Sequence, residues 1–381
     1  MKTILVVLGT RPEAIKLAPV IKRFREDANL QINVLSTGQH GVMLDEALEA
    51  FEIRVDYFMK TLSPGQTLSS LSTKLLTGAS RIISKIAPDL VIVHGDTSSA
   101  FCAALAAYYL GVPVAHVEAG LRTHNKFEPF PEEFNRSAIS RIATWHFAPT
   151  ELAKDNLKKE GIDSKAIQVT GNTVVDSVDF VAKRFLTDMH WMRENVAKIR
   201  QEIFPFFMEK PFVVVTLHRR ENAGKIFAGY LSVIRRVASR NQDFHFVFPV
   251  HPNPSISAPA REALSDLSNV HLSLPIDYLT FSNLLAKSSG IVTDSGGLQE
   301  EGVTFGKPVF LCRSSTERPE GVAAGKIQPI GQNYELLEKE LELEIRKGKS
   351  GFNETELFLR GNPYGDGLAS QKIFDFIKLN L

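Results

Sequence analysis

Short apolar runs alternate with stretches of helical spacing along the first half of the chain. Residues 4–8 form an uninterrupted apolar run, and after Pro12 the apolar positions recur every three or four residues as far as Phe24. This pattern predicts a buried strand followed by a helix. Further apolar runs predict strands at residues 32–35, 90–93, 114–117, 145–148 and 167–170. Continuously apolar strands that alternate with helices are typical of a parallel sheet covered on both faces.

The same pattern restarts after a helical, linker-like stretch at about residues 176–207. Strands are expected at residues 212–217, 244–250, 270–274, 291–293 and 309–311. The last twelve residues, 370–381, carry an apolar stripe at helical spacing. Because 381 residues exceed the size at which a single core usually keeps growing, two α/β domains are predicted.

Composition and charge exclude several classes of protein. The 44 Lys and Arg residues balance 43 Asp and Glu residues, and the net charge of +1 argues against wholesale binding of nucleic acid or of an anionic membrane. Two cysteines, Cys102 and Cys312, exclude a disulfide framework and offer no metal-ligand spacing. The opening apolar run has no signal-peptide cleavage site, and no run approaches the roughly 20 apolar residues of a membrane helix. We therefore expect a cytoplasmic protein.

Polar side chains follow the predicted strands of the first half, where ligands of open parallel sheets bind. The residues at these places are Arg11, Lys16, Asp96 and Glu118, and, on a nearby loop rich in Phe and Pro, Glu132, Asn135 and Arg136. Because successive strands are usually neighbours, Asp96 and Glu118 should project into one crevice.

Each of these residues also has a simpler interpretation. An Asp at a strand end often only caps the next helix, which applies to Asp96. Glu118 is poorly explained as a cap, because a glycine and a basic residue follow it. Glu132 taken alone is more often a surface residue, and Arg11 and Lys16 could form a solvated helix face. Their joint placement at strand ends favours a site.

Residues 293–301 place two glycines between a strand and a helix. Gly296 and Gly297, next to Ser295, let the backbone approach a ligand, and the N–H groups and dipole of the helix suit a diphosphate. Glu301, one turn further on, could hold ribose hydroxyls. The alternative is a plain strand-to-helix turn.

The segment 216–222, which contains His218, Arg219 and Arg220, ends another strand and adds positive charge to the second half. Arg318 could contact a phosphate, although alone it is more often an ordinary surface residue. The chain has no G-x-G-x-x-G motif, which removes the main support for dinucleotide oxidoreduction. Residues 302–308 resemble a P-loop only superficially, because one residue is missing between the glycines and a proline replaces the required Ser or Thr. Neither H-E-x-x-H nor a cysteine cluster suggests zinc.

These segments, in this order, resemble the non-hydrolysing UDP-N-acetylglucosamine 2-epimerases. The matching pieces are GTRPEAIK from Gly9, VHGDT from Val93, HVEAGLRT from His116, PEEFNR from Pro131, TGNTVVD from Thr170, HRREN from His218, TDSGGLQEE from Thr293, TERPE from Thr316 and NPYGDG from Asn362. The resemblance implies an α/β fold of two Rossmann-like doubly wound domains facing a cleft, called GT-B-like. It implies a first domain at 1–176 completed by a crossing helix at 364–381, and a UDP-binding domain at 177–363.

The resemblance also implies a reaction in two stages between UDP-GlcNAc and UDP-ManNAc. UDP is eliminated as the C2 proton leaves, which gives 2-acetamidoglucal, and UDP then adds back as C2 is reprotonated on the other face. No cofactor and no metal are needed. The family further implies a homodimer that supplies the synthesis of cell-surface polysaccharides.

Family roles carried onto the matching positions make Asp96, Glu118 and Glu132 the acid/base candidates, with His218 as a further catalytic candidate near UDP. The residues implied to bind the UDP-sugar are Arg11, Lys16, Arg136, Phe281 on the uracil side, Ser295, Gly296, Gly297, Glu301 and Arg318.

Two positions depart from the family pattern. Many bacterial members have an arginine after the Gln and His of an activator loop, where this chain has Gln39, His40 and then Gly41. This loop, with Gln66, is the candidate for a second, activating UDP-GlcNAc site, and loss of the arginine predicts weak activation. Ile276 stands where some members have a Gln near the uracil.

Three other functions stay open from the sequence. A hydrolysing 2-epimerase would release UDP and ManNAc, and a GT-B glycosyltransferase would require an acceptor. A non-catalytic sensor would bind UDP without turnover.

Overall fold

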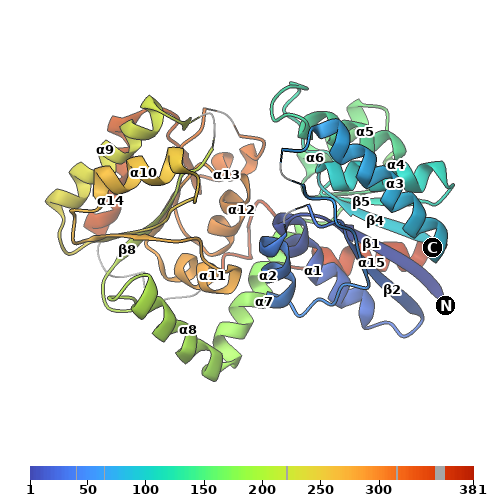
Figure 1. Cartoon of the computed structure of the whole chain (residues 1–381), viewed down its shortest axis with the longest axis horizontal. Coiled ribbons are helices and arrows are strands. Elements are labelled where there is room, and N and C mark those ends of the chain that lie inside the picture. The colour runs from blue at the N-terminus through green and yellow to red at the C-terminus, as the bar shows by residue number, and fades with distance from the viewer. Residues whose placement is uncertain (40, 64, 220–221, 315, 348–356) are drawn as a thin grey trace. The chain divides into compact units, whose positions relative to one another are not determined.

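The computed structural model describes residues 1–381 except 40, 64, 220–221, 315 and 348–356. The described chain divides into two compact units, Met1–Ser177 with Tyr364–Leu381, and Val178–Pro363. Figure 1 shows helices packed around a sheet in each unit.

The first unit is built on a seven-stranded sheet in which every neighbouring pair is parallel and the strand order is β3-β2-β1-β4-β5-β6-β7. The strands are β1 (Lys2–Leu8), β2 (Leu30–Ser36), β3 (Tyr57–Phe58), β4 (Leu90–His94), β5 (Val114–Val117), β6 (Trp145–Ala148) and β7 (Ile167–Val169). The strand order changes direction between β1 and β4. In doubly wound sheets, ligands bind at the carboxyl ends of such a pair.

Helices cover both faces of this sheet. They are α1 (Arg11–Arg25), α2 (Val42–Ala50), α3 (Leu68–Ile86), α4 (Ser98–Tyr109), α5 (Glu132–Ile142), α6 (Glu151–Lys159), the start of α7 (Thr173–Thr187) and α15 (Ala369–Asn380), with a short 3-10 helix at Ser164–Ala166. Leu5 and Val7 of β1 share one apolar cluster with α3, α4 and α5. The alternate β1 residues Ile4 and Val6 are equally buried. Because alternate strand residues face opposite sides, both faces of the sheet are covered.

The C-terminal helix α15 completes the first unit by packing against α1 (Figure 1). The rings of Phe24 and Phe374 meet edge to face with centroids 5.3 Å apart. Phe376 packs in the same manner on Phe147 of β6 at 5.5 Å. The last segment of the chain therefore belongs to the core of the first unit.

The second unit contains a six-stranded parallel sheet in the order β10-β9-β8-β11-β12-β13. Its strands are β8 (Phe212–Thr216), β9 (His245–Pro249), β10 (Val270–Ser273), β11 (Gly290–Thr293), β12 (Val309–Leu311) and β13 (Ile327–Pro329). Its helices are the rest of α7, α8 (Met189–Glu202), α9 (Lys225–Arg240), α10 (Pro254–Leu264), α11 (Tyr278–Lys287), α12 (Gly296–Thr304), α13 (Pro319–Ala323) and α14 (Tyr334–Lys347). In this second sheet the strand order changes direction between β8 and β11.

The prediction of two parallel-sheet α/β domains is confirmed. The sequence reading missed the short strands β3 and β13. Among the helices that the structure describes, none is both long and apolar enough to cross a membrane.

Candidate active site

Asp96 and Glu118 follow two neighbouring strands at the same edge of the first sheet. The pairing of β4 with β5 ends with His94 opposite Val117. Glu118 follows Val117 directly, and Asp96 follows His94 after one glycine. Asp96 does not cap α4, because Thr97 is the N-cap residue and its hydroxyl accepts a hydrogen bond from the N–H of Ala100 at 3.0 Å. The interpretation of Asp96 as a helix cap is therefore wrong.

Glu118 forms a buried ion pair with Lys16 of α1, and both side chains are less than one tenth exposed. The same carboxylate oxygen, Oε2, accepts a hydrogen bond from Asn172 Nδ2 at 2.8 Å and lies 3.8 Å from His94 Nε2. Lys16 is thus not part of a solvated helix face. Glu118 also has a φ of +63°, which residues other than glycine rarely adopt. Strain of this kind concentrates at functional sites.

Arg136 of α5 anchors Asp96 through an ion pair. A second guanidinium nitrogen of Arg136, Nη1, lies 3.2 Å from Glu133 Oε2, and Asn135 Nδ2 donates to the backbone oxygen of Asp96 at 2.9 Å. The first turns of α5 are therefore fixed to the loop after β4. Glu132 is the half-buried first residue of this helix and not a loop residue, which corrects the sequence reading.

Glu13, which the sequence reading did not include among the site residues, joins the loops after β1 and β4. Its Oε2 accepts hydrogen bonds from the N–H groups of Gly9 at 2.9 Å and Thr10 at 2.7 Å, and its Oε1 accepts one from the Thr97 hydroxyl at 2.6 Å. Burial raises the pKa of Glu13 from 4.5 to about 7, although these hydrogen bonds act in the opposite direction. Thr10 and Glu13 form a capping box, a spacing that is visible in the sequence. The half-buried Arg11 opens α1 between them.

His116 stabilises the turn that leads to Asp96. Its Nε2 lies 2.7 Å from the backbone oxygen of Gly95, which has a φ of +65°. Burial lowers the pKa of His116 to about 3, so the ring is neutral at physiological pH.

The structure describes part of the candidate activator loop. Gln39 accepts a hydrogen bond from the Ser99 hydroxyl at 2.7 Å, and Ser99 is in turn 2.7 Å from Thr37 Oγ1. Gly41 precedes α2 with a φ of +52°, and Gln66 is half-buried. The remaining predicted residue, His40, lies outside the described residues.

In the second unit, the loop after β11 leads directly into α12. Ser295 is the N-cap residue, and its side chain makes no capping hydrogen bond to the helix. The N–H groups of the first turn, which begins with Gly296 and Gly297, have no partner within the helix. Such a terminus can bind a phosphate oxygen.

Arg318 lies against the start of α12 within a buried network of charges. Its Nε donates to Glu300 Oε1 at 2.5 Å, its Nη1 pairs with Glu317, and Arg313 pairs with the other Glu317 oxygen at 3.2 Å. A Cβ added to Gly296 would lie 2.9 Å from Arg318 Nη1, so the glycine admits the guanidinium. Arg318 is less than one tenth exposed, and its interpretation as an ordinary surface arginine is wrong.

Asp294 fixes the loop after β8 next to the start of α12. The side chain is fully buried and accepts hydrogen bonds from the N–H groups of His218 at 3.0 Å and Arg219 at 2.9 Å, and from Asn222 Nδ2 at 2.9 Å. The His218 ring lies 3.5 Å from the same carboxylate, stacks on His251, and is 40% exposed. Asp294 therefore presents the His218 imidazole towards solvent.

Two predicted nucleotide contacts are buried residues of the second unit. Glu301 faces the start of its own helix, since a Cβ added to Gly297 would lie 3.7 Å from Glu301 Oε1. Phe281 lies in α11, a helix in which every residue is buried. The N-terminus of α11 is fixed by Asp277, which accepts from the N–H of Thr280 at 2.9 Å.

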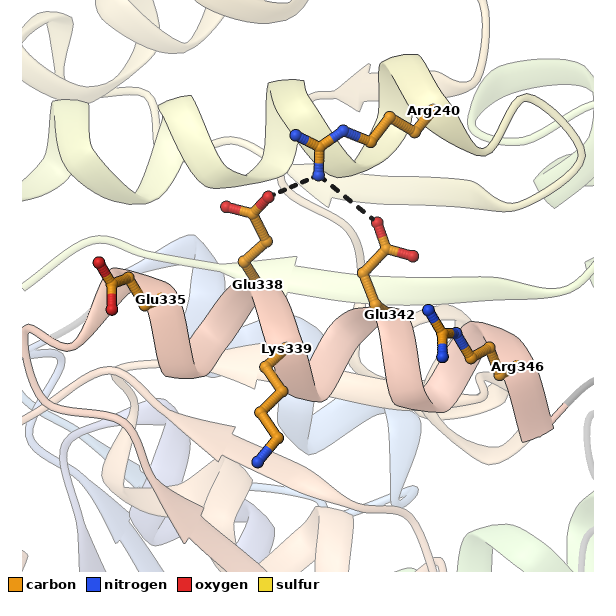
Figure 2. Close-up of a pocket in the computed structure, with 6 residues that line it drawn as sticks. All are labelled: Arg240, Glu335, Glu338, Lys339, Glu342 and Arg346. Carbon is orange, nitrogen blue, oxygen red and sulfur yellow. Dashed lines mark hydrogen bonds and ion pairs between the residues drawn. The ribbon is translucent and has the colours of Figure 1, made fainter.

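A separate hollow on the second unit contains none of the predicted residues. Figure 2 shows that it lies along α9 and α14 and is lined by Arg240, Glu335, Glu338, Lys339, Glu342 and Arg346. Arg240 pairs there with Glu338 at 2.7 Å and with Glu342 at 4.0 Å (Figure 2). Exposed ion pairs of this kind contribute little to stability.

No group of three or more His, Cys, Asp or Glu side chains is placed to hold a metal ion within the part of the chain that the structure describes. The candidate residues form two sets, one in each unit. The first contains the buried ion pair of Glu118 with Lys16 and the half-buried Asp96 paired with Arg136. The second contains a helix N-terminus beside Arg318 and His218. The first set suits proton transfer, and the second suits a diphosphate.

Comparisons of the sequence and of the structure with known proteins find the same family of enzymes. The sequence model of the family described as UDP-N-acetylglucosamine 2-epimerase matches residues 22–378. The UDP-N-acetylglucosamine 2-epimerase of Salmonella typhimurium is 40% identical to this chain over 377 residues, with 98% of each chain covered.

Solved structures show the same relationship. The UDP-GlcNAc 2-epimerase from Neisseria meningitidis, bound to UDP-GlcNAc, matches with a TM-score of 0.90 and 39% identity over 99% of this chain and 100% of that chain. The UDP-GlcNAc 2-epimerase from Methanocaldococcus jannaschii, in complex with UDP-GlcNAc and UDP, matches with a TM-score of 0.80 and 30% identity over the whole of both chains. The predicted GT-B-like fold class is confirmed by these matches.

Proposed function

The chain belongs to the UDP-N-acetylglucosamine 2-epimerase family, and we propose that it interconverts UDP-GlcNAc and UDP-ManNAc without hydrolysis. In the first stage a carboxylate takes the proton from C2, the bond between C1 and the UDP oxygen breaks, and UDP leaves with the electron pair. The product of this stage is 2-acetamidoglucal. In the second stage a carboxylic acid protonates C2 on the opposite face, and the UDP oxygen bonds to C1 again.

The observation that carries this proposal is the buried pair of Glu118, which follows β5, and Lys16, which lies in the helix after β1. A carboxylate held by a cation in a site of low exposure has a fixed position, as a general base requires. Asp96, held by Arg136, is the second candidate, and Glu132 at the start of α5 is the third. We assign proton transfer to these three carboxylates.

The second unit supplies the affinity for UDP in this proposal. The N–H groups at the start of α12, the Arg318 guanidinium and the His218 imidazole can stabilise the negative charge that develops on the departing diphosphate. Glu301 is assigned to the ribose hydroxyls and Phe281 to the uracil side. The relatives from Neisseria meningitidis and Methanocaldococcus jannaschii, which bind UDP-GlcNAc, support this choice of substrate.

Four further residues complete the proposed binding sites. Arg11 at the start of α1 is assigned to UDP, and Gln39, His40 and Gln66 to a second site whose activating effect is weak. We also propose that the enzyme is a cytoplasmic homodimer that supplies the synthesis of cell-surface polysaccharides. Light scattering should find twice the mass of one chain, and a monomer would contradict the dimer.

Product analysis tests the reaction type. The purified protein is incubated with UDP-GlcNAc, and nucleotides and free sugars are separated by chromatography. We expect UDP-ManNAc in equilibrium with UDP-GlcNAc and only traces of free UDP. Equal amounts of UDP and ManNAc would show a hydrolysing enzyme, and a product formed only with an added sugar acceptor would show a glycosyltransferase.

A further inference from the structure

Asn172, which neither the sequence reading nor the proposed reaction uses, lies beside Glu118. It is 3% exposed, and its Nδ2 donates to Glu118 Oε2 at 2.8 Å. The Oδ1 atom of the same amide accepts a hydrogen bond from the N–H of Val174 at 3.0 Å. Because the backbone N–H can only donate, Oδ1 must face Val174, and the NH₂ group is left for Glu118. The orientation of this amide is therefore fixed from both ends.

The backbone of Asn172 is held by the C-terminal segment of the chain. Its N–H donates to the backbone oxygen of Tyr364 at 2.7 Å. Gly171 and Gly365 have φ values of +89° and +128°, and a Cβ added to Gly171 would lie 3.2 Å from the Cα of Gly365. Two glycines are thus needed for the two segments to approach this closely.

Asp176, one turn further along α7, strengthens the same connection. Its carboxylate accepts hydrogen bonds from the N–H groups of Ala369 at 3.1 Å and Ser370 at 2.8 Å, and from the Ser370 hydroxyl at 2.6 Å. The Ser177 hydroxyl donates to the backbone oxygen of Ile15 at 2.6 Å, next to Lys16. The start of α7 is therefore fixed both to α15 and to the helix that carries the partner of Glu118.

We propose that Asn172 is a positioning residue for Glu118, and that it connects the C-terminal segment beginning at Tyr364 to this acid/base carboxylate. The inference rests on the proposed function, since it requires Glu118 to transfer a proton. A donor aimed at Oε2 stabilises the ionised carboxylate and fixes the direction of its lone pairs. Lys16 and His94 face the same oxygen, and Asn172 is the amide donor among these neighbours.

The test separates the contact to Glu118 from the contact to Val174. Ser and Asp both accept a hydrogen bond at a helix N-cap, so Asn172→Ser and Asn172→Asp keep that contact and lose the donor to Glu118. The acid limb of the pH profile of kcat should move upward by about one unit in Asn172→Ser. It should move further in Asn172→Asp, because a second carboxylate disfavours ionisation of Glu118. Affinity for UDP should change by less than about threefold.

Two further variants make the result decisive. Ser370→Ala weakens the docking of α15 without touching Glu118, so it should lower Tm and leave the pH profile unchanged. Glu118→Gln should lose kcat by about 10²-fold or more. Because His94 lies 3.8 Å from the same oxygen, wild type and Asn172→Ser are also compared in a His94→Gln background, where the upward shift should persist.

Each contrary result has its own meaning. If Glu118→Gln is inactive but Asn172→Ser and Asn172→Asp keep the wild-type profile, Asn172 only caps α7, and this inference fails while the proposed function stands. If Ser370→Ala shifts the profile as far as Asn172→Ser does, the shift reflects loosened packing and the inference also fails. If Glu118→Gln keeps normal kcat, the assignment of Glu118 fails, and the inference fails with it.

Discussion

The buried carboxyl group of Glu13 should contribute to the stability of the first unit a part that is lost as pH rises. Its pKa is about 7 in the folded protein and 4.5 without burial. Between these two values the folded state holds a proton that the unfolded chain has released. Proton binding to the folded state stabilises it, so the contribution of Glu13 to the free energy of unfolding decreases from pH 5 to pH 8. The neutral His116 contributes in the opposite direction in parent and variant alike, so the effect of Glu13 is read as the difference between the two.

The size of the effect follows from the two pKa values. One pKa unit corresponds to about 1.36 kcal/mol, so a shift of this size is worth on the order of 2 kcal/mol between pH 5 and pH 8. Glu13→Gln removes the titration while keeping the shape of the side chain. The amide oxygen can still accept from the N–H groups of Gly9 and Thr10, and the NH₂ group can donate to Thr97. We expect the variant to lose this part of the pH dependence.

The two tryptophans allow the first unit to be followed separately. Trp145 lies in β6 of the first unit and Trp191 in α8 of the second. In a Trp191→Phe background, urea unfolding at pH 5 and pH 8 is followed by the fluorescence of Trp145. Glu26→Gln is the matched control, because Glu26 is exposed and pairs with Arg23 on the surface. The reasoning is refuted if Glu13→Gln keeps the same pH dependence as its parent, or if Glu26→Gln loses it.

Three kinetic predictions follow from the proposed division of roles. Asp96→Asn, Glu118→Gln and Glu132→Gln should each lower kcat by roughly 10²–10⁴-fold, with UDP affinity changed by less than about tenfold in calorimetry, or about 1.4 kcal/mol. Normal kcat in any of them removes that residue from catalysis. Glu301→Ala should weaken UDP binding more than it lowers kcat at saturation, and a loss confined to kcat would contradict its binding role. Because Gly41 replaces a basic residue, the reverse reaction from UDP-ManNAc alone should start without a lag, whereas a lag abolished by traces of UDP-GlcNAc would show intact activation.

The sequence predicted most of the fold because buried parallel strands are apolar along their whole length. The runs at residues 4–8 and 90–93 are of this kind, and both are strands. β3 has only two residues, which is too short for a hydrophobic pattern, and in β13 the polar Gln328 directly follows Ile327, so no apolar run marks this strand. Glu132 was assigned to a loop because Phe and Pro precede it, yet a helix can begin directly after Pro131.

From the sequence, the candidate site can be predicted only at residues that follow the predicted strands. Asp96 and Glu118 each follow an apolar run, so their approximate position can be read from the sequence. Their partners cannot, because the ion pair of Glu118 and the hydrogen bond from Asn172 join residues 102 and 54 positions apart. Such contacts depend on the tertiary packing of α1 and α7. Glu13 was the exception, since its capping box is local and could have been recognised.

The central claim is that the C2 proton is exchanged while UDP is retained, and incubation in D₂O tests it most directly. The protein is incubated with UDP-GlcNAc in D₂O until equilibrium, and the C2 position of both sugars is followed by NMR. We expect UDP-GlcNAc and UDP-ManNAc that both carry deuterium at C2, with little free UDP. Epimers that keep hydrogen at C2, or deuterated ManNAc released together with an equal amount of UDP, would contradict the proposed reaction.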